Sequence, residues 1–182
     1  MSTPVVLAYP DYAALPADGR HYELHDGELS VTPAPSPRHQ EVSGNLWDLL
    51  HHYLLRGSGS GKVFYAPIDC ILSETTIVQP DLVYVGPGAR GQITPRGIEG
   101  PPTLVVEILS PSTLQIDRGV KLQLYARYGI PHYWIVDPDG RDIVAHALGR
   151  GAYAVVARLA GAAPVALPPF PDLVLDPASI WP

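Results

Sequence analysis

Residues 101–113 read PPTLVVEILSPST and place a glutamate in the middle of an apolar run. The segment from Thr103 to Leu109 is β-branched and aliphatic, with prolines before it and Ser-Pro-Ser after it, which predicts a short buried strand. Glu107 is the one charged residue in this segment. Because a desolvated carboxylate without a partner is strongly destabilising, we expect a protein cation, a metal ion or exposure at the strand end to compensate it.

Length and composition limit the class of protein. The chain has 182 residues, of which 46% are hydrophobic, and this predicts one folded domain over residues 1–182 with a sizeable core. No apolar run is long enough to span a bilayer, and the N-terminus lacks the basic and apolar regions of a secretory signal. Cys70 is alone, which excludes an internal disulfide. We therefore expect a cytoplasmic protein with no membrane partner.

The charge balance restricts the mode of binding. The formal net charge is −6 and there is no basic run, which counts against broad electrostatic attraction to nucleic acid. It leaves open an enzyme whose metal ions supply the positive charge. Lys62 and Lys121 are the only lysines among twelve basic residues.

The N-terminal third predicts a hairpin and two helices. Two alternating runs joined by Asp26-Gly27 form the hairpin, and alternation predicts that Leu24 faces the core and Glu23 faces solvent. A short helix is expected over 11–19. Ser36 as N-cap, Pro37 at the first helical position and Gly57 at the end bound a longer helix, in which His39 points inward from the first turn.

The remaining segments complete a mixed sheet. A helix is predicted from a capping box at Ser112 to Tyr128, with Gly129 as its left-handed cap, and residues 86–102 are predicted to be a loop. Besides the glutamate strand, strands are predicted at 62–72, 81–85, 132–136, 142–148 and 152–158. The order αβββαβ predicts an α/β (α+β) fold with a mixed central sheet flanked by helices, an N-terminal β-hairpin and extra C-terminal strands.

Two charges fall inside the apolar arc of the second long helix. Asp117 and Lys121 lie there and are four residues apart, so they can pair, and a structural ion pair is one interpretation. The other interpretation is that Lys121 belongs to a functional site. Glu107 lies roughly 7 Å below the end of its strand, and Lys121 lies roughly 13 Å along a helix that returns beside it, so the ammonium can approach that carboxylate.

A second carboxylate opens the strand at 81–85. Asp81 follows Pro80, although Pro-Asp-Leu-Val recurs at 171–174 and is therefore a weak signal. Two carboxylates from neighbouring strand ends suit a hard cation such as Mg²⁺. A metal there would activate water and neutralise charge on a phosphate, and Lys121 would orient or deprotonate that water, or stabilise the phosphate.

These three residues resemble the active site of the PD-(D/E)XK nuclease superfamily, whose fold has the same αβββαβ order. In that superfamily an Asp on one strand and a Glu on the next hold a divalent metal. The usual lysine lies two residues after the glutamate, where this chain has Leu109. Some families carry the lysine on the following helix, and Lys121 fits that arrangement.

A more specific resemblance is to the Uma-two family of restriction-endonuclease-like proteins. It rests on five segments taken in order: YELHDGEL, SPRHQEVSGNL, QPDLVYV, LVVEILSPST and DRGVKLQLYARYGIPHYWIVDP. The resemblance extends over about residues 20–160 and implies that these residues form the core of a restriction-endonuclease-like domain. The resemblance implies that Asp81, Glu107 and the carbonyl of Ile108 bind Mg²⁺ or Mn²⁺. It also implies that Lys121 is catalytic.

Three further residues are candidates for supporting roles. Glu28 and His39 match family positions near the site, and Asp117 accompanies Lys121 on the helix. For His39, a core histidine with satisfied hydrogen bonds is an equal alternative.

The function expected from the sequence is a divalent-metal-dependent endonuclease acting on DNA. A homodimer is expected, because two sites cut both strands of a duplex most easily. The alternative is a catalytically silent nucleic-acid-binding or protein-interaction module on the same fold. A glycosidase that uses Asp81 and Glu107 as its acid pair would leave the buried lysine unexplained.

Overall fold

The computed structural model describes residues 5–57, 60–110 and 119–182. Its elements in chain order are α1 (Tyr9–Ala13), β1 (His21–His25), β2 (Glu28–Thr32), α2 (Pro37–Leu55), β3 (Lys62–Tyr65), β4 (Cys70–Ser73), β5 (Thr76–Val78), β6 (Leu82–Val85), β7 (Gln92–Thr94), β8 (Gly97–Glu99), β9 (Leu104–Ile108), α3 (Lys121–Tyr128), β10 (His132–Asp137), β11 (Asp142–Gly149), β12 (Ala152–Ala160), β13 (Val165–Ala166), β14 (Val174–Leu175) and η2 (Pro177–Ser179).

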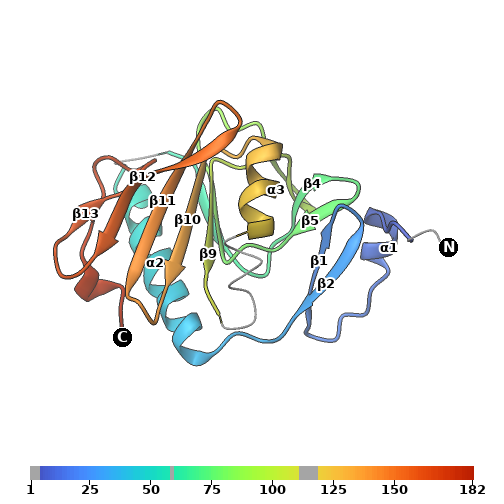
Figure 1. Cartoon of the computed structure of the whole chain (residues 1–182), viewed down its shortest axis with the longest axis horizontal. Helices are drawn as coiled ribbons and strands as arrows, with labels where there is room; N and C mark the ends of the chain where they lie inside the picture. The colour runs from blue at the N-terminus through green and yellow to red at the C-terminus, as the bar shows by residue number, and fades with distance from the viewer. Residues whose placement is uncertain (1–4, 58–59, 111–118) are drawn as a thin grey trace.

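The central sheet has the strand order β12-β11-β10-β9-β6-β3. β9 and β10 run parallel and are joined by the crossover that contains α3, whereas the other neighbours in this sheet are antiparallel. Helices α2 and α3 cover its opposite faces (Figure 1). The mixed sheet flanked by helices that the sequence predicts is therefore confirmed.

Side chains of β9 alternate between the two faces. Leu104 and Val106 pack in the core beneath α2, whereas Val105 packs with Leu124 of α3. Because successive side chains on a strand point to opposite faces, Glu107 lies on the α3 face. The position of the glutamate in the strand thus determines which helix it meets.

A second sheet, with strand order β2-β1-β5-β4-β8-β7, packs against the other side of α3. The Tyr128 hydroxyl donates to Ser73 Oγ at 2.9 Å and lies 3.0 Å from Thr76 Oγ1. Arg127 Nη2 pairs with the Asp26 carboxylate at 2.6 Å. These contacts hold α3 between the two sheets and bring the N-terminal hairpin close to β9.

Several predicted boundaries are wrong. The single strand predicted over 62–72 is broken at Pro67 into β3, which joins the central sheet, and β4, which joins the second sheet. The loop predicted over 86–102 contains the hairpin of β7 and β8, whose Ile98 is fully buried. Helix α1 covers Tyr9–Ala13 instead of 11–19, because Pro16 disfavours helical geometry in the residue before it.

The N-terminal hairpin has the predicted register and a different burial. Leu24 pairs with Leu29 and Glu23 pairs with Ser30, as expected. However, Glu23 is buried, whereas Leu29 and Val31 are exposed. The reason is tertiary: Lys121 of α3 lies against Glu23 on one face of β1, and Leu7, Tyr9 and Tyr12 pack with Leu24 on the other.

The predicted ends of the long helices are confirmed where the structure describes them. Ser36 Oγ accepts the backbone N–H of His39 at 3.2 Å to open α2, and Gly129 closes α3 with a φ of +75°. The capping box predicted at Ser112 lies outside the described residues. In the described part of the chain, no helix has both the length and the apolar character needed to cross a membrane.

Candidate active site

One cavity of about 630 Å³ lies at the junction of the hairpin, the start of α2, the ends of β6 and β9, and the start of α3. Asp81, Glu107 and Lys121 line it together with His39 and Ile108. They come from four separate segments of the chain. The structure therefore brings together the residues that the sequence analysis selected, and their chemical roles stay predictions.

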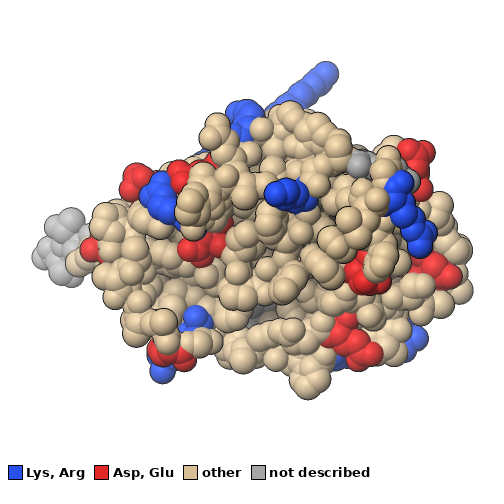
Figure 2. Space-filling view, turned by 180° about the vertical axis from the view of Figure 1, so that it is seen from behind, with Lys and Arg blue, Asp and Glu red and all other residues tan. Residues whose placement is uncertain are grey.

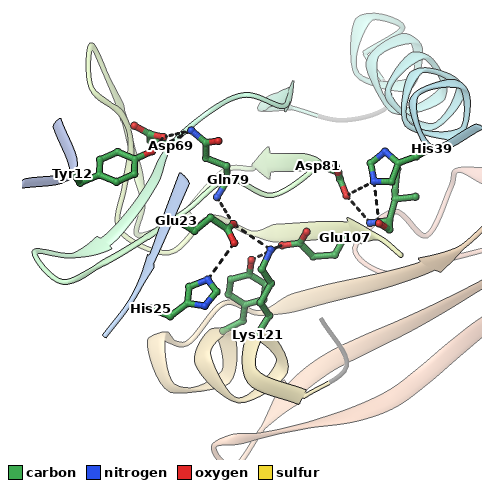
Figure 3. Close-up of polar contacts among 11 residues, drawn as sticks. Tyr12, Glu23, His25, His39, Asp69, Gln79, Asp81, Glu107 and Lys121 are labelled. Atoms are coloured by element: carbon green, nitrogen blue, oxygen red, sulfur yellow. Dashed lines mark hydrogen bonds and ion pairs between the residues drawn. The ribbon is translucent and has the colours of Figure 1, made fainter. Parts of the chain in front are cut away.

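The carboxylate of Glu107 is compensated by a protein cation and a hydroxyl. Lys121 Nζ lies 3.0 Å from Glu107 Oε1, and the Tyr125 hydroxyl donates to the same oxygen at 2.5 Å (Figure 3). Glu107 and Lys121 are only 4% and 5% exposed. Burial raises the pKa of Tyr125 well above its usual value, and the Glu107 charge adds to this effect, so the phenol stays protonated as a donor.

A second buried carboxylate holds Lys121 from the hairpin side. Lys121 Nζ lies 3.2 Å from Glu23 Oε1, which also accepts the backbone N–H of Gln79 at 2.7 Å. His25 Nε2 lies 3.2 Å from the other carboxylate oxygen. Burial alone would raise the pKa of Glu23, but the charge of Lys121 and the hydrogen bonds from His25 and Gln79 outweigh it and lower that pKa to about 2.

Lys121 therefore lies between two carboxylates that come from different sheets. One negative neighbour favours a protonated ammonium group, and a second one favours it further. The pairing also fixes the position of the nitrogen, because Glu23 and Glu107 are each held by further hydrogen bonds. This arrangement suits Lys121 to act as a fixed positive charge.

Asp81 is tied to the backbone of β9 in the other half of the site. Its Oδ2 accepts the N–H of Ile108 at 2.7 Å and lies 3.3 Å from His39 Nε2. The same His39 nitrogen lies 3.0 Å from the carbonyl oxygen of Ile108. Since a carbonyl and a carboxylate can only accept, Nε2 carries a proton and donates to them. His39 thus positions two of the predicted metal ligands and does not offer Nε2 as a ligand itself.

The donor set fits a hard divalent cation. Asp81, Glu107 and the Ile108 carbonyl offer oxygen atoms only, and Asp81 Oδ1 makes no hydrogen bond within the described residues. Across residues 5–57, 60–110 and 119–182, no three His, Cys, Asp or Glu side chains form a metal-binding group by themselves. Mg²⁺ needs no such group, because it commonly binds one or two carboxylates and keeps several waters or substrate oxygens.

Two of the predicted supporting residues are not placed at the cavity. Glu28 is exposed on β2 and does not line the cavity, so the structure separates it from Asp81 and Glu107. Glu28 pairs with His25 beside the turn of the hairpin, whereas the hairpin meets the cavity toward its other end, at His21 and Thr32. Asp117 lies outside the described residues, and its predicted pairing with Lys121 stays a prediction.

Two residues of the site, Tyr125 and Glu23, were not predicted from the sequence. Tyr125 follows Lys121 by four residues on α3, so helical spacing alone indicates that both reach the same neighbour. Glu23 carried no such signal. Strand alternation assigned it to a solvent face, and its partners Gln79 and Lys121 lie far away in the chain.

Comparison with known proteins gives both a fold and a family. A solved structure of similar fold is that of a putative nuclease belonging to DUF820 from Anabaena variabilis ATCC 29413, with a TM-score of 0.76 and 16% sequence identity. The match covers 96% of this chain and 97% of that chain. No curated protein matches the sequence. The family model Uma2, described as "Putative restriction endonuclease", matches residues 9–178. With the model spanning nearly the whole chain, this protein belongs to the Uma2 (Uma-two) family.

Proposed function

We propose that this protein is a Mg²⁺- or Mn²⁺-dependent endonuclease that hydrolyses phosphodiester bonds in DNA. Its family and its fold support a nuclease. One observation carries the proposal: Asp81, Glu107 and Lys121 line a single cavity, and the ammonium group of Lys121 is held between two buried carboxylates. Acidic metal ligands beside a fixed ammonium group suit phosphoryl chemistry, because the negative charge that develops on the phosphate needs positive partners.

In this proposal Asp81, Glu107 and the Ile108 carbonyl hold the metal ion. When bound, Mg²⁺ or Mn²⁺ supplies a Lewis acid that lowers the pKa of a water and neutralises charge on the phosphate. His39 maintains the geometry of this set, because its Nε2 proton bridges Asp81 and the Ile108 carbonyl. Such supporting groups typically affect metal affinity or activity by about 10- to 100-fold.

In this proposal Lys121 acts through its positive charge and does not serve as the general base that removes a proton from the water. Its ammonium is stabilised by Glu23 at 3.2 Å and Glu107 at 3.0 Å, and both contacts would have to weaken before it lost a proton. We therefore assign Lys121 to stabilising the phosphate and orienting the water. Tyr125 keeps the Glu107 carboxylate aligned through its hydroxyl.

The alternative is a catalytically silent binding module on the same fold, which the acidic net charge of −6 favours. On the face shown in Figure 2, lysine and arginine side chains are scattered among aspartate and glutamate. Titration with Mg²⁺ and Mn²⁺ separates the two functions, since a silent module needs no divalent ion. We also expect a homodimer, which light scattering on the purified protein would test.

The decisive experiment compares the wild-type protein with Glu107→Gln. We expect Mg²⁺-dependent cleavage of DNA by the wild type, abolished by chelation and reduced at least about 10³-fold in the variant. Glu74→Gln, which changes an exposed carboxylate away from the cavity, is the matched control for contaminating nuclease. Equal cleavage by wild type and Glu107→Gln, or no divalent binding by calorimetry, would reject the proposal.

A further inference from the structure

The cavity continues beyond the charged residues into an aromatic and proline-rich part. On α2 the lining residues His39, Ser43 and Trp47 recur every four residues, so the cavity follows this helix for about 12 Å. The apolar lining of this part includes Pro33, Pro35, Trp47, Tyr65, Ala66 and Pro67. A volume of about 630 Å³ is in the range of sites that enclose a small organic group.

Tyr65 presents an aromatic ring that is exposed and yet fixed. It is 59% exposed, although it lines the cavity. The ring meets Trp47 edge to face, with centroids 5.3 Å apart and planes at 82°. Trp47 is itself stacked on His51 at 4.5 Å and 11°. A large ring held in place by other rings, with most of its surface open, is a platform for stacking a flat ligand.

The platform lies next to the predicted metal ligands. Tyr65 pairs with Leu82 across β3 and β6, and Leu82 directly follows Asp81. The N–H of Ala66 donates to the carbonyl of Asp81 at 3.0 Å. Tyr65 and Asp81 also line the same cavity, so a ligand with its phosphate near Asp81 has its adjoining ring system within reach of Tyr65.

The charges of the cavity disfavour binding through phosphates alone. Its cationic residues are already engaged with acidic partners: Lys121 with Glu23 and Glu107, and Arg38 with Asp139 at 3.0 Å. Duplex recognition depends largely on lysine and arginine contacts to phosphates. Single strands are bound in addition by stacking of bases on aromatic side chains, which requires a base whose face is not covered by its neighbours.

We propose that Tyr65, supported by Trp47, is a base-stacking subsite, and that the substrate strand is unpaired at the nucleotide beside the scissile phosphate. This inference rests on the proposed nuclease function and specifies its substrate class as single-stranded nucleic acid. The subsite recognises the flat face that all bases share, so it confers preference for unpaired strands without preference for sequence.

The test is a binding titration that does not depend on cleavage. A fluorescein-labelled single-stranded DNA 12-mer and its blunt duplex are titrated with the full chain, with Ca²⁺ as the hard divalent cation, and anisotropy is recorded. Three variants are compared with the wild type: Tyr65→Ala, Tyr65→Phe, which keeps the ring, and Tyr22→Ala, which removes a ring outside the cavity. Circular dichroism checks that each variant is folded.

We expect the wild type to prefer the single strand, Tyr65→Ala to lose about 5- to 100-fold in single-strand affinity, and the other two variants to bind as the wild type does. Equal affinity of wild type and Tyr65→Ala, tighter binding of the duplex, or no binding of either oligonucleotide would overturn the subsite. Binding that depends on Tyr65 without any cleavage would reject the nuclease and keep the subsite. Cleavage that is unaffected in Tyr65→Ala would keep the nuclease function and reject the subsite.

Discussion

The tetrapeptide Pro-Asp-Leu-Val occurs twice, and the two copies have different surroundings. In the first, at 80–83, Asp81 accepts the N–H of Ile108, and the Leu and Val that follow are fully buried in β6. In the second, at 171–174, Asp172 is exposed and the final Val174 is 60% exposed. Identical local sequence therefore gives one candidate metal ligand and one solvated aspartate.

The difference lies in the neighbours of each copy. β6 lies between β3 and β9 in the central sheet. β9 provides the N–H of Ile108, and α2 provides His39, which lies beside Asp81. Among the residues that the structure describes, β14 pairs with β13 alone, in a two-stranded sheet. The proposed role of Asp81 therefore depends on the groups that surround it in space, because the local sequence of the two copies is the same.

The largest expected effect separates the two aspartates directly. Asp81→Asn should lower metal-dependent cleavage about 10³-fold, because it removes the charge that faces the cation. Asp172→Asn should leave cleavage within about twofold of wild type. Initial rates on the same DNA substrate, with calorimetric Mg²⁺ titration, measure both. Equal losses in the two variants would contradict the comparison.

The next effect applies the same contrast to two glutamates of the hairpin. Glu23→Gln should lower kcat about 10- to 100-fold with little change in KM, because Lys121 loses one of the carboxylates that hold it. Glu28→Gln, on the exposed edge strand, should change neither constant.

Steady-state kinetics, with melting temperatures measured in parallel, distinguish positioning from simple destabilisation. Glu23→Asp, which keeps the charge on a shorter side chain, should recover part of kcat. A change in KM alone would argue against the positioning role of Glu23.

A smaller effect concerns stability. Val83→Ala removes two buried methyl groups from the core shared by β6 and α3 and should cost about 2 kcal/mol. Val174→Ala, at the corresponding position of the second copy, should cost less than about 0.5 kcal/mol. Urea unfolding followed by circular dichroism gives both values. Comparable costs would mean that β14 is packed as tightly as β6.

The last prediction is a pH dependence of stability. The pKa of Glu23 is lowered from its usual 4.5 to about 2, so its contribution to stability is complete above about pH 5 and is lost as pH falls toward 2. The unfolding free energy of the wild type should therefore fall more steeply between pH 5 and 3 than that of Glu23→Gln. Parallel slopes in urea titrations across this range would show that Glu23 is not the group responsible.

Much of the architecture was predictable because it depends on local signals. Ser36, Pro37 and Gly129 mark helix ends by capping chemistry, and Asp26-Gly27 sets the hairpin register. The division of residues 62–72 between two sheets was not predictable, since it depends on which strand each half pairs with.

The sequence by itself determined that a glutamate in a buried strand needs compensation, and it selected Asp81 and Lys121 as its companions. Only the tertiary structure decided that Glu23 joins them and that Glu28 does not. The physical reason is the range of the interactions. Hydrogen-bonded turns and caps act over a few residues, whereas the electrostatic environment of a buried charge is set by whichever distant segments fold against it.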